Sequence, residues 1–192
     1  MADRVRLFIS AGPELETERE AIGRALAAFP INLGWEIKRT ARADEAADLK
    51  AVRGCDFFVM LFASDIRAPV GWEWMAARRA ERPHLAFLKE GVLQTPAGRE
   101  FVRALGKEWR PFRTGQELAK RLVEAVSEQI LECWQEFGLS AREWEVLLAY
   151  LARVRGKKPE DSQETRLAGA GEGGVILAPG RDVPKGGVVV EG

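Results

Sequence analysis

A carboxylate follows a long apolar segment in the middle of this sequence. A continuous apolar run ends at Phe62, a short polar loop comes next, and the amphipathic segment after it carries Glu73 near its start. The run is typical of a parallel strand buried on both faces, and ligands bind just beyond the carboxyl ends of such strands. We place Glu73 in the first turn of the following helix, where the helix dipole favours an ionised side chain.

An ionised carboxylate in a crevice can stabilise an oxocarbenium-like sugar carbon or attack it. Glu73 is therefore the candidate catalytic residue for cleaving the N-glycosidic bond of a nucleoside or of NAD. A second interpretation stays open, because a glutamate at a helix start is also common as a surface residue that complements the dipole.

Several neighbouring residue types fit a nucleotide ligand. Trp72 and Trp74 flank Glu73, so that one ring can stack on a base or a nicotinamide while the other packs inward. Hydroxyl and carboxylate groups in the adjoining loops can bind ribose hydroxyls, and an arginine can bind a phosphate. The predicted substrate-binding residues are Ser10, Ala11, Gly12, Ser64, Asp65, Arg67 and Trp72.

Other common chemistries find little support in the sequence. The loop Ser10-Ala-Gly-Pro13 has one glycine and a proline without an amide donor, unlike the phosphate-binding loops of Rossmann and P-loop folds. A phospho-accepting aspartate should end the third strand, but Asp56 lies at the wrong end of it and Asp65 lies in the loop beyond. The single histidine, His84, has no ligand-spaced neighbour, which argues against a metal site and a Ser-His-Asp triad. We expect no metal and no cofactor, with NAD as a substrate.

Composition limits the partners and the compartment. Lys plus Arg and Asp plus Glu both number 29, so no overall field attracts nucleic acid or an acidic membrane. The two cysteines, Cys55 and Cys133, lie far apart in apolar stretches and indicate buried thiols in a reducing compartment. The sequence has neither a signal-peptide pattern nor an apolar run of the ~18 residues that a bilayer requires. We predict a cytoplasmic protein.

Strand and helix patterns alternate along the chain. Apolar positions at spacings of three, four and seven residues predict helices, and short alternating or continuous apolar runs predict strands. The last strand is either a true strand or an extended connection. Strands are predicted at 4–10, 35–40, 55–62, 84–88 and 108–112, and helices at 13–29, 44–53, 69–81, 96–105, 115–137 and from 141 onward.

This alternation predicts an α/β fold, a flavodoxin-like three-layer sandwich with a mostly parallel sheet of four or five strands. The charged second strand indicates a sheet edge, which favours the order 2-1-3-4-5. In that order the crevice lies between strands one and three, flanked by Ser10-Ala-Gly-Pro13 and Ala63-Ser-Asp-Ile-Arg-Ala68.

Four regions are expected along the chain. Residues 1–137 form the α/β domain, and 138–155 form a C-terminal amphipathic helix whose stripe packs on the domain or, as the less frequent outcome, on a second copy. Residues 156–174 are rich in Gly, Glu, Lys and Ser and indicate a flexible linker. Residues 175–192 are a β-prone, Gly-rich tail, either disordered alone or a strand pair awaiting a partner edge. The stripe consists of Trp144, Leu147, Leu148 and Leu151.

The order of several segments resembles an uncharacterised TIR-like family. Arg6-Leu-Phe-Ile-Ser10 followed by Glu14-Leu-Glu-Thr-Glu-Arg19 is similar to the opening of that family, whose members often stand N-terminal to STAND-type signalling NTPases. The resemblance extends over residues 4–130. It continues through Cys55–Phe62, Gly71-Trp-Glu73, Pro83–Leu88 and Phe112–Leu118.

The resemblance implies two functions from different classes. The wider superfamily includes TIR domains and nucleoside 2-deoxyribosyltransferases, in which a glutamate after the third strand acts at ribose C1′, and Glu73 matches that position. The chain lacks the Trp-Cys pair that precedes the TIR glutamate and the Asp-x-Gly-Thr run of the transferases. One implied function is a signalling or prokaryotic defence effector that cleaves NAD or a nucleotide, either alone or only after self-association. The other is a non-catalytic adaptor that works with a separately encoded signalling NTPase.

Overall fold

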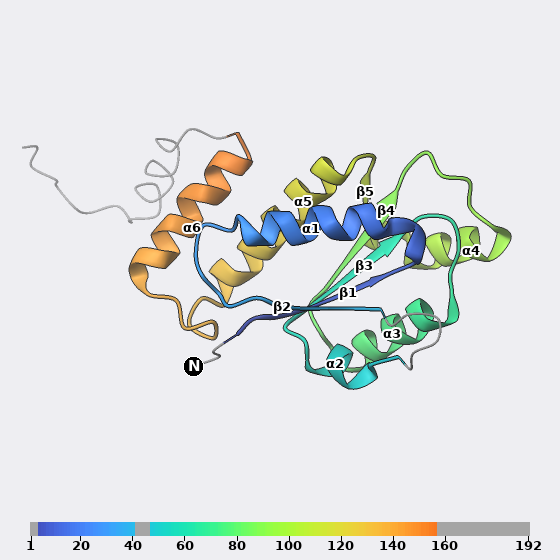
Figure 1. Cartoon of the computed structure of the whole chain (residues 1–192), viewed down its shortest axis with the longest axis horizontal. Coiled ribbons are helices and arrows are strands. Elements are labelled where there is room, and N and C mark those ends of the chain that lie inside the picture. The colour runs from blue at the N-terminus through green and yellow to red at the C-terminus, as the bar shows by residue number, and fades with distance from the viewer. Residues whose placement is uncertain (1–3, 41–46, 157–192) are drawn as a thin grey trace, which may run out of the picture. The chain divides into compact units, whose positions relative to one another are not determined.

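A computed structural model of the chain describes residues 4–40 and 47–156. In these residues a single sheet is enclosed by helices (Figure 1). The predicted linker beyond Gly156, the predicted tail 175–192, and residues 44–46 of the predicted second helix lie outside the described residues.

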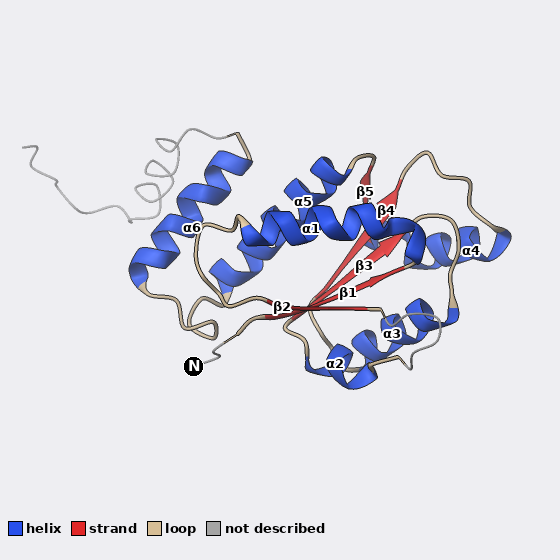
Figure 2. Ribbon diagram, viewed as in Figure 1, coloured by secondary structure: helices blue, strands red, loops and turns tan. Residues whose placement is uncertain are grey.

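The sheet has five strands in the order β2-β1-β3-β4-β5, and every neighbouring pair is parallel. Figure 2 shows this sheet with helices on both sides. The predicted α/β fold and strand order are therefore confirmed. The strands are β1 (Arg6–Ala11), β2 (Glu36–Arg39), β3 (Phe57–Phe62), β4 (His84–Lys89) and β5 (Trp109–Phe112).

Helices connect successive strands and cover the two faces of the sheet. The helices α1 and α5 pack on one face, and α2, α3 and α4 pack on the other. None of the helices among the described residues is both long and apolar enough to cross a membrane. The helices are α1 (Glu16–Ala27), α2 (Leu49–Gly54), α3 (Ala68–Arg79), α4 (Pro96–Leu105), α5 (Gly115–Glu132) and α6 (Ala141–Val154), with short 3-10 turns at Pro13–Leu15 and Gly106–Glu108.

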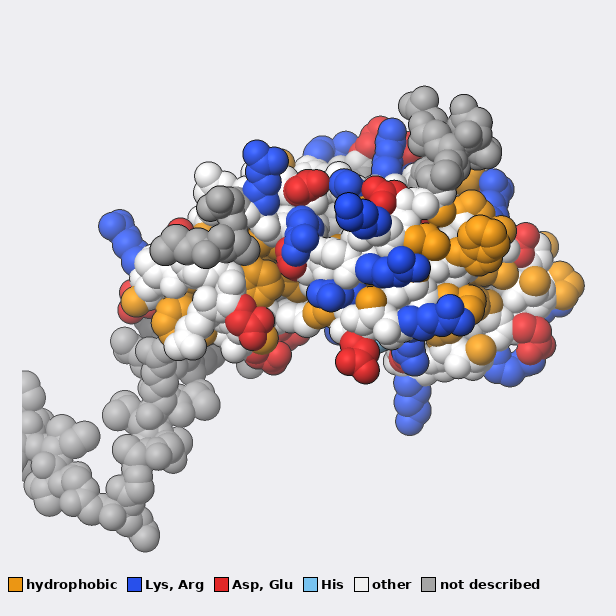
Figure 3. Space-filling view, turned by 90° about the horizontal axis from the view of Figure 1, so that it is seen from below, with side chains coloured by type: hydrophobic (Ala, Val, Ile, Leu, Met, Phe, Trp, Pro, Cys, Tyr) orange, Lys and Arg blue, Asp and Glu red, His pale blue; other side chains and the backbone are white. Residues whose placement is uncertain are grey.

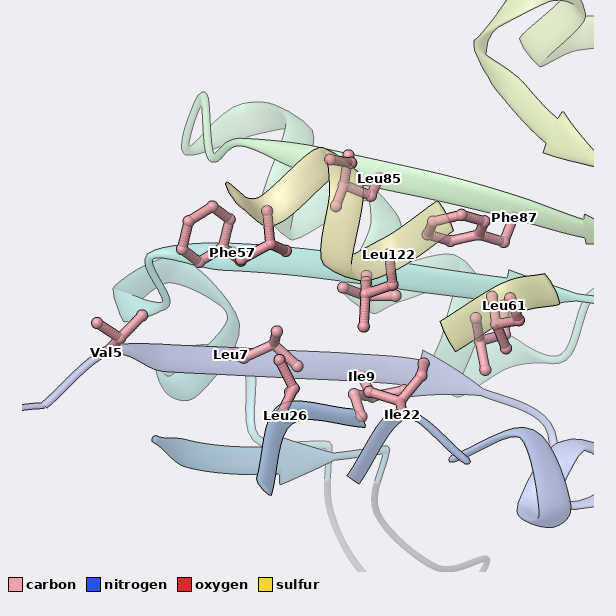
Figure 4. Close-up of a cluster of buried hydrophobic side chains, with 14 of the residues drawn as sticks. Val5, Leu7, Ile9, Ile22, Leu26, Phe57, Leu61, Leu85, Phe87 and Leu122 are labelled. Carbon is pink, nitrogen blue, oxygen red and sulfur yellow. The ribbon is translucent and has the colours of Figure 1, made fainter. Parts of the chain in front are cut away.

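The alternation of side chains along each strand divides the core in two. In β1, Leu7 and Ile9 face α1 and α5, whereas Phe8 packs on the opposite face against Phe58 of β3. All six residues of β3 are buried because helices cover both of its faces, which explains its continuous apolar sequence. Figure 4 shows the larger cluster, to which Val5, Leu7, Ile9, Ile22, Leu26, Phe57, Leu61, Leu85, Phe87 and Leu122 contribute.

The last predicted strand forms and pairs with β4 over its whole length. It is an edge strand, and Pro111 is tolerated there because one side of an edge strand needs no partner for its amide groups. The alternative of an extended connection is therefore wrong.

The fifth helix ends earlier than predicted, at Glu132 instead of Phe137. The chain turns at residues 133–138, where Gly138 adopts a positive φ of 67° and the Leu139 amide donates to the Trp134 carbonyl. This turn lays the Phe137 ring flat against Phe57, with ring centroids 5.7 Å apart. Phe137 thus reaches the core from a turn and not from the helical stripe.

The helix α6 begins with the predicted capping box. The Glu143 amide donates to the Ser140 hydroxyl, and the Glu143 carboxylate accepts from the Ser140 amide. Leu147 is fully buried and belongs to the cluster that lies against α1 and α5, and Leu151 is also buried. Trp144 and Leu148 are half-buried.

Candidate functional site

An open pocket of about 530 Å³ lies at the carboxyl ends of β1 and β2. A volume of this size is within the range of small-molecule sites. The pocket is built from segments far apart in the sequence: the turn after β1, the end of β2, and the starts of α1 and α3. Its polar and charged lining residues are Glu16, Arg19, Arg39, Thr40 and Arg67, and its other lining residues are Ala11, Gly12, Pro13, Pro69 and Val70.

Glu73 lies behind this lining, in the interior of the protein. Its side chain has 0% exposure and is not part of the pocket wall. Oε2 accepts a hydrogen bond from the Ser10 hydroxyl at 2.6 Å and another from the Thr40 hydroxyl at 2.7 Å. Oε1 is buried and has no partner among residues 4–40 and 47–156. A residue of β1 and the residue that follows β2 thus hold one oxygen of the carboxyl and leave the other unpaired.

The position of Glu73 in its helix differs from the prediction. The helix α3 begins at Ala68, with Pro69 in its first turn, so that Glu73 falls in the second turn. The effect of the helix dipole fades within the first turn. Dipole stabilisation of a surface carboxylate therefore does not describe this residue.

Burial controls the electrostatics of Glu73. Desolvation raises the pKa of its carboxyl, while the hydrogen bonds from Ser10 and Thr40 and the charge of Arg19 act to lower it, and the net result is a raised pKa. Desolvation disfavours the charged form, whereas a hydroxyl that donates to a carboxylate favours it. The site thus contains a carboxyl that titrates above its ordinary value of 4.5.

The structure brings some of the predicted substrate-binding residues to this place. Ser10 is fully buried and bonded to Glu73, and Ala11, Gly12 and Arg67 line the pocket. These residues and Glu73 come from β1, from the turn after it and from the region of α3, as the strand order requires.

Ser64 and Asp65 do not line the pocket, because both are hydrogen-bonded to Thr95 at the start of α4. The Asp65 carboxylate accepts from the Thr95 hydroxyl at 2.6 Å, and the Ser64 carbonyl accepts from the Thr95 amide at 2.9 Å. Any side chain at position 98 would collide with Ser64, because a Cβ added to Gly98 would lie 2.4 Å from the Ser64 carbonyl oxygen. This close approach keeps Ser64 and Asp65 beside α4 and outside the pocket lining.

Trp72 is 63% exposed on α3 and does not line the pocket. Trp74 is the inward-facing ring, and it packs edge-on against His84 with centroids 5.3 Å apart. Seen from the side of α2 and α3, hydrophobic side chains gather toward one end of the surface, beside many Lys and Arg side chains (Figure 3). The structure therefore separates Trp72 from the carboxyl that it adjoins in sequence.

Thr40, Arg19 and Arg39 belong to the site but were not predicted from the sequence. Thr40 follows β2 directly, at the sheet edge where β1 also ends. The sequence offered one usable signal, because a polar residue at the end of any parallel strand lies on the ligand-binding edge. The crevice predicted between strands one and three does not include the end of the second strand, where the structure places Thr40.

Three arginines give the pocket an excess of positive charge. Arg39 pairs with Glu16 at 3.1 Å, Arg19 pairs with the same carboxylate at 2.8 Å, and Arg67 lies 3.8 Å from Glu14. The Nε of Arg19 is buried and has no partner among the described residues. Guanidinium groups bind phosphate through paired N–H donors, so this arrangement suits an anionic ligand.

Two other types of site find no support in the described part of the chain. His, Cys, Asp and Glu side chains do not gather there in any group of three that could hold a metal ion. Burial raises the pKa of the Cys55 thiol to about 11, so that it stays protonated and unreactive near neutral pH. Glu73, by contrast, combines a raised carboxyl pKa with a buried oxygen that has no partner among the described residues.

No family model matches the chain, and no curated protein matches it. Among solved structures, the CMP N-glycosidase BcmB of Clostridium botulinum is similar over 61% of this chain and 97% of its own, with 19% sequence identity and a TM-score of 0.42. Because both values are low, we rest the proposal below on the geometry of the site.

Proposed function

We propose that the protein cleaves the N-glycosidic bond of NAD or of another nucleotide, with Glu73 as the catalytic residue. The observation that carries this proposal is the carboxyl itself: it is buried at the carboxyl edge of the sheet, held through Oε2 by Ser10 and Thr40, and unpaired at Oε1. Such a group is costly to bury, and perturbed carboxyls of this kind are concentrated at functional sites.

The proposed reaction would pass through a transition state in which the sugar carries positive charge. The bond between C1′ and the base nitrogen breaks, and its electron pair leaves with the base. Positive charge then develops on the ribose ring, where an ionised Glu73 stabilises it or bonds to C1′ through Oε1. Water supplies the hydroxyl group that ends on C1′; its remaining proton goes to solvent when nicotinamide leaves NAD as a neutral base, and to the departing base when the substrate is another nucleotide. The products are the free base and a ribose that keeps its phosphate.

The arginines favour a phosphorylated substrate over a free nucleoside. Arg39, the last residue of β2, and Arg67, just before α3, both line the pocket, and more than half of each side chain is exposed. A phosphate could therefore exchange with Glu16 or Glu14 as their partner. The resemblance to the TIR-like family supports the same substrate class, because it implies an effector that acts on NAD.

One observation favours a second function, that of a non-catalytic TIR-like adaptor acting with a signalling NTPase. The Glu73 carboxyl has no exposed surface, so that a ligand in the pocket reaches it only if the lining moves. A carboxyl that no ligand can reach would serve only as a structural hydrogen-bond acceptor for Ser10 and Thr40. In that case binding would depend on the surface and on the tail.

A turnover assay separates the two functions. The concentrated full chain is incubated with NAD, with nucleoside monophosphates and with the matching nucleosides, and the released base is measured by chromatography. We expect base release from a phosphorylated substrate, and a loss of at least about 100-fold in Glu73→Gln, because the variant cannot supply a charged oxygen. The matched control is Glu20→Gln, an exposed glutamate on α1 whose loss should leave turnover unchanged.

Turnover that survives Glu73→Gln would contradict the assignment of the catalytic residue. If no substrate of either class is consumed at any protein concentration, the adaptor function is favoured. It then predicts that a signalling NTPase is captured by the full chain and no longer captured when residues 156–192 are removed.

A further inference from the structure

We propose that Thr40 is a positioning residue for Glu73: its hydroxyl is fixed as a donor to Oε2, and it thereby leaves Oε1 as the oxygen that binds a ligand. This inference rests on the proposed function, and it goes beyond it by identifying which oxygen reacts and which residue outside the helix α3 determines that choice. The residue lies at the end of the edge strand β2, 33 positions from Glu73 in sequence.

Three hydrogen bonds fix Thr40 in place. Its amide donates to the Ile9 carbonyl at 3.1 Å, which continues the pairing of β2 with β1 beyond the last residue of the strand. Its hydroxyl oxygen accepts from the Ala11 amide at 3.0 Å, and its hydroxyl proton goes to Glu73 Oε2 at 2.7 Å. Both the main chain and the side chain of Thr40 are thus tied to β1.

The bond from Ala11 gives the hydroxyl a direction. A threonine hydroxyl has one proton and two lone pairs, and its proton normally rotates to suit its neighbours. Here the Ala11 amide occupies one lone pair, so the proton is left to point at Glu73. No second partner of this kind is present for Ser10 among the described residues, so that Thr40 is the more strongly oriented of the two donors.

Two donors on Oε2 make the two carboxyl oxygens unequal. A proton that binds to Glu73 would meet two hydroxyl protons at Oε2 and none at Oε1, among the described partners. Protonation and bond formation are therefore both directed to Oε1. Arg19 is the charged group whose field also acts on this carboxyl, and it favours the ionised form as the hydroxyls do.

The experiment follows the titration of the Glu73 carboxyl carbon by NMR in the ¹³C-glutamate-labelled full chain, together with kcat. Thr40→Val keeps the shape of the side chain and removes the hydroxyl. We expect the titration midpoint of Glu73 to rise. We also expect kcat to fall about 10- to 100-fold near neutral pH, the loss that corresponds to removing one hydrogen bond to a charged group. Thr40→Ser keeps the hydroxyl and should restore both values, and the exposed Thr17→Val should change neither.

An unchanged titration midpoint in a folded Thr40→Val variant would overturn the inference. Thr40→Ala removes the same hydroxyl with less steric demand and serves as a second test if Thr40→Val does not fold. The unmodified protein gives a reading that needs no substitution: the Ala11 amide should exchange slowly with deuterium, and exchange at the rate of an exposed amide would equally overturn the inference.

These results also distinguish this inference from the proposed function. If Thr40 controls the titration of Glu73 but no nucleotide is consumed, the function is wrong and the positioning role stands. If turnover depends on Glu73 while Thr40→Val changes neither kcat nor the titration, the function stands and the positioning role is wrong.

Discussion

The carboxyl of Glu73 experiences two opposing influences. Its burial disfavours charge, and its contacts with two hydroxyls and the field of Arg19 favour charge. Burial is the largest of these, so the pKa of the group is raised. A raised pKa means that the folded protein holds the Glu73 proton more tightly than the unfolded chain does.

The pH dependence of stability follows from this difference. The stabilising contribution of Glu73 is fully present below the ordinary value of 4.5 and is lost as pH rises through the raised folded-state pKa. We therefore expect the free energy of unfolding of wild type to fall relative to Glu73→Gln as pH rises from 4 to 8, because only the wild type must bury a charge. Urea denaturation of both proteins across this range measures the difference.

A difference between the two proteins that stays constant with pH would show that Glu73 titrates alike in the folded and unfolded states. A difference that changes in the opposite direction would show that the hydroxyls outweigh burial. Either result would contradict the environment described for this carboxyl.

The sequence placed Glu73 near Ser10 at the carboxyl edge of the sheet, but it did not indicate the contact with Thr40. Glu73 could be found because it follows a continuous apolar run. The contact with Thr40 could not, because it depends on where β2 ends relative to β1, which is set by pairing between distant segments. The choice between Trp72 and Trp74 was predictable, since Trp74 shares the spacing of four and three residues with the buried Val70 and Ala77.

At the scale of the elements, the helices and strands were predictable where one local pattern dominated. The capping box of Ser140 and Glu143 correctly placed the start of α6. The end of α5 was not predictable, because Phe137 continues the helical spacing but packs on Phe57 from a turn. The spacing of apolar residues in a sequence does not reveal tertiary contacts of this kind.

The helix α6 provides a test of how the C-terminal element is held. Leu147 is fully buried against the core that α1 and α5 share, so that Leu147→Ala should lower the free energy of unfolding by about 2–5 kcal/mol. The matched control is the neighbouring Val146→Ala, where the side chain is 41% exposed and the loss should be much smaller. Chemical denaturation measures both.

Equal and small losses in these two variants would mean that α6 does not depend on its buried face. A second unfolding transition in Leu147→Ala alone would instead mean that α6 unfolds apart from the sheet.

For the whole molecule, the strand order determines where chemistry can occur. Parallel strands end at one edge, and the order 2-1-3-4-5 brings the ends of β1 and β2 together with the start of α3. The sequence predicted this edge correctly. It also placed Ser64 and Asp65 there, and the loop that carries them is instead bonded to Thr95 at the start of α4.

The central claim is that the Glu73 carboxyl meets the sugar carbon of a nucleotide in the pocket beside it. The most direct test is a crystal structure of the Glu73→Gln variant with an intact nucleotide that the wild type consumes. We predict that C1′ lies about 3–3.5 Å from the atom of the residue 73 side chain that takes the place of Oε1, with the phosphate on the arginines and the pocket lining other than Thr40 displaced to admit the sugar. A nucleotide bound elsewhere, or a sugar that does not reach position 73, would contradict the claim.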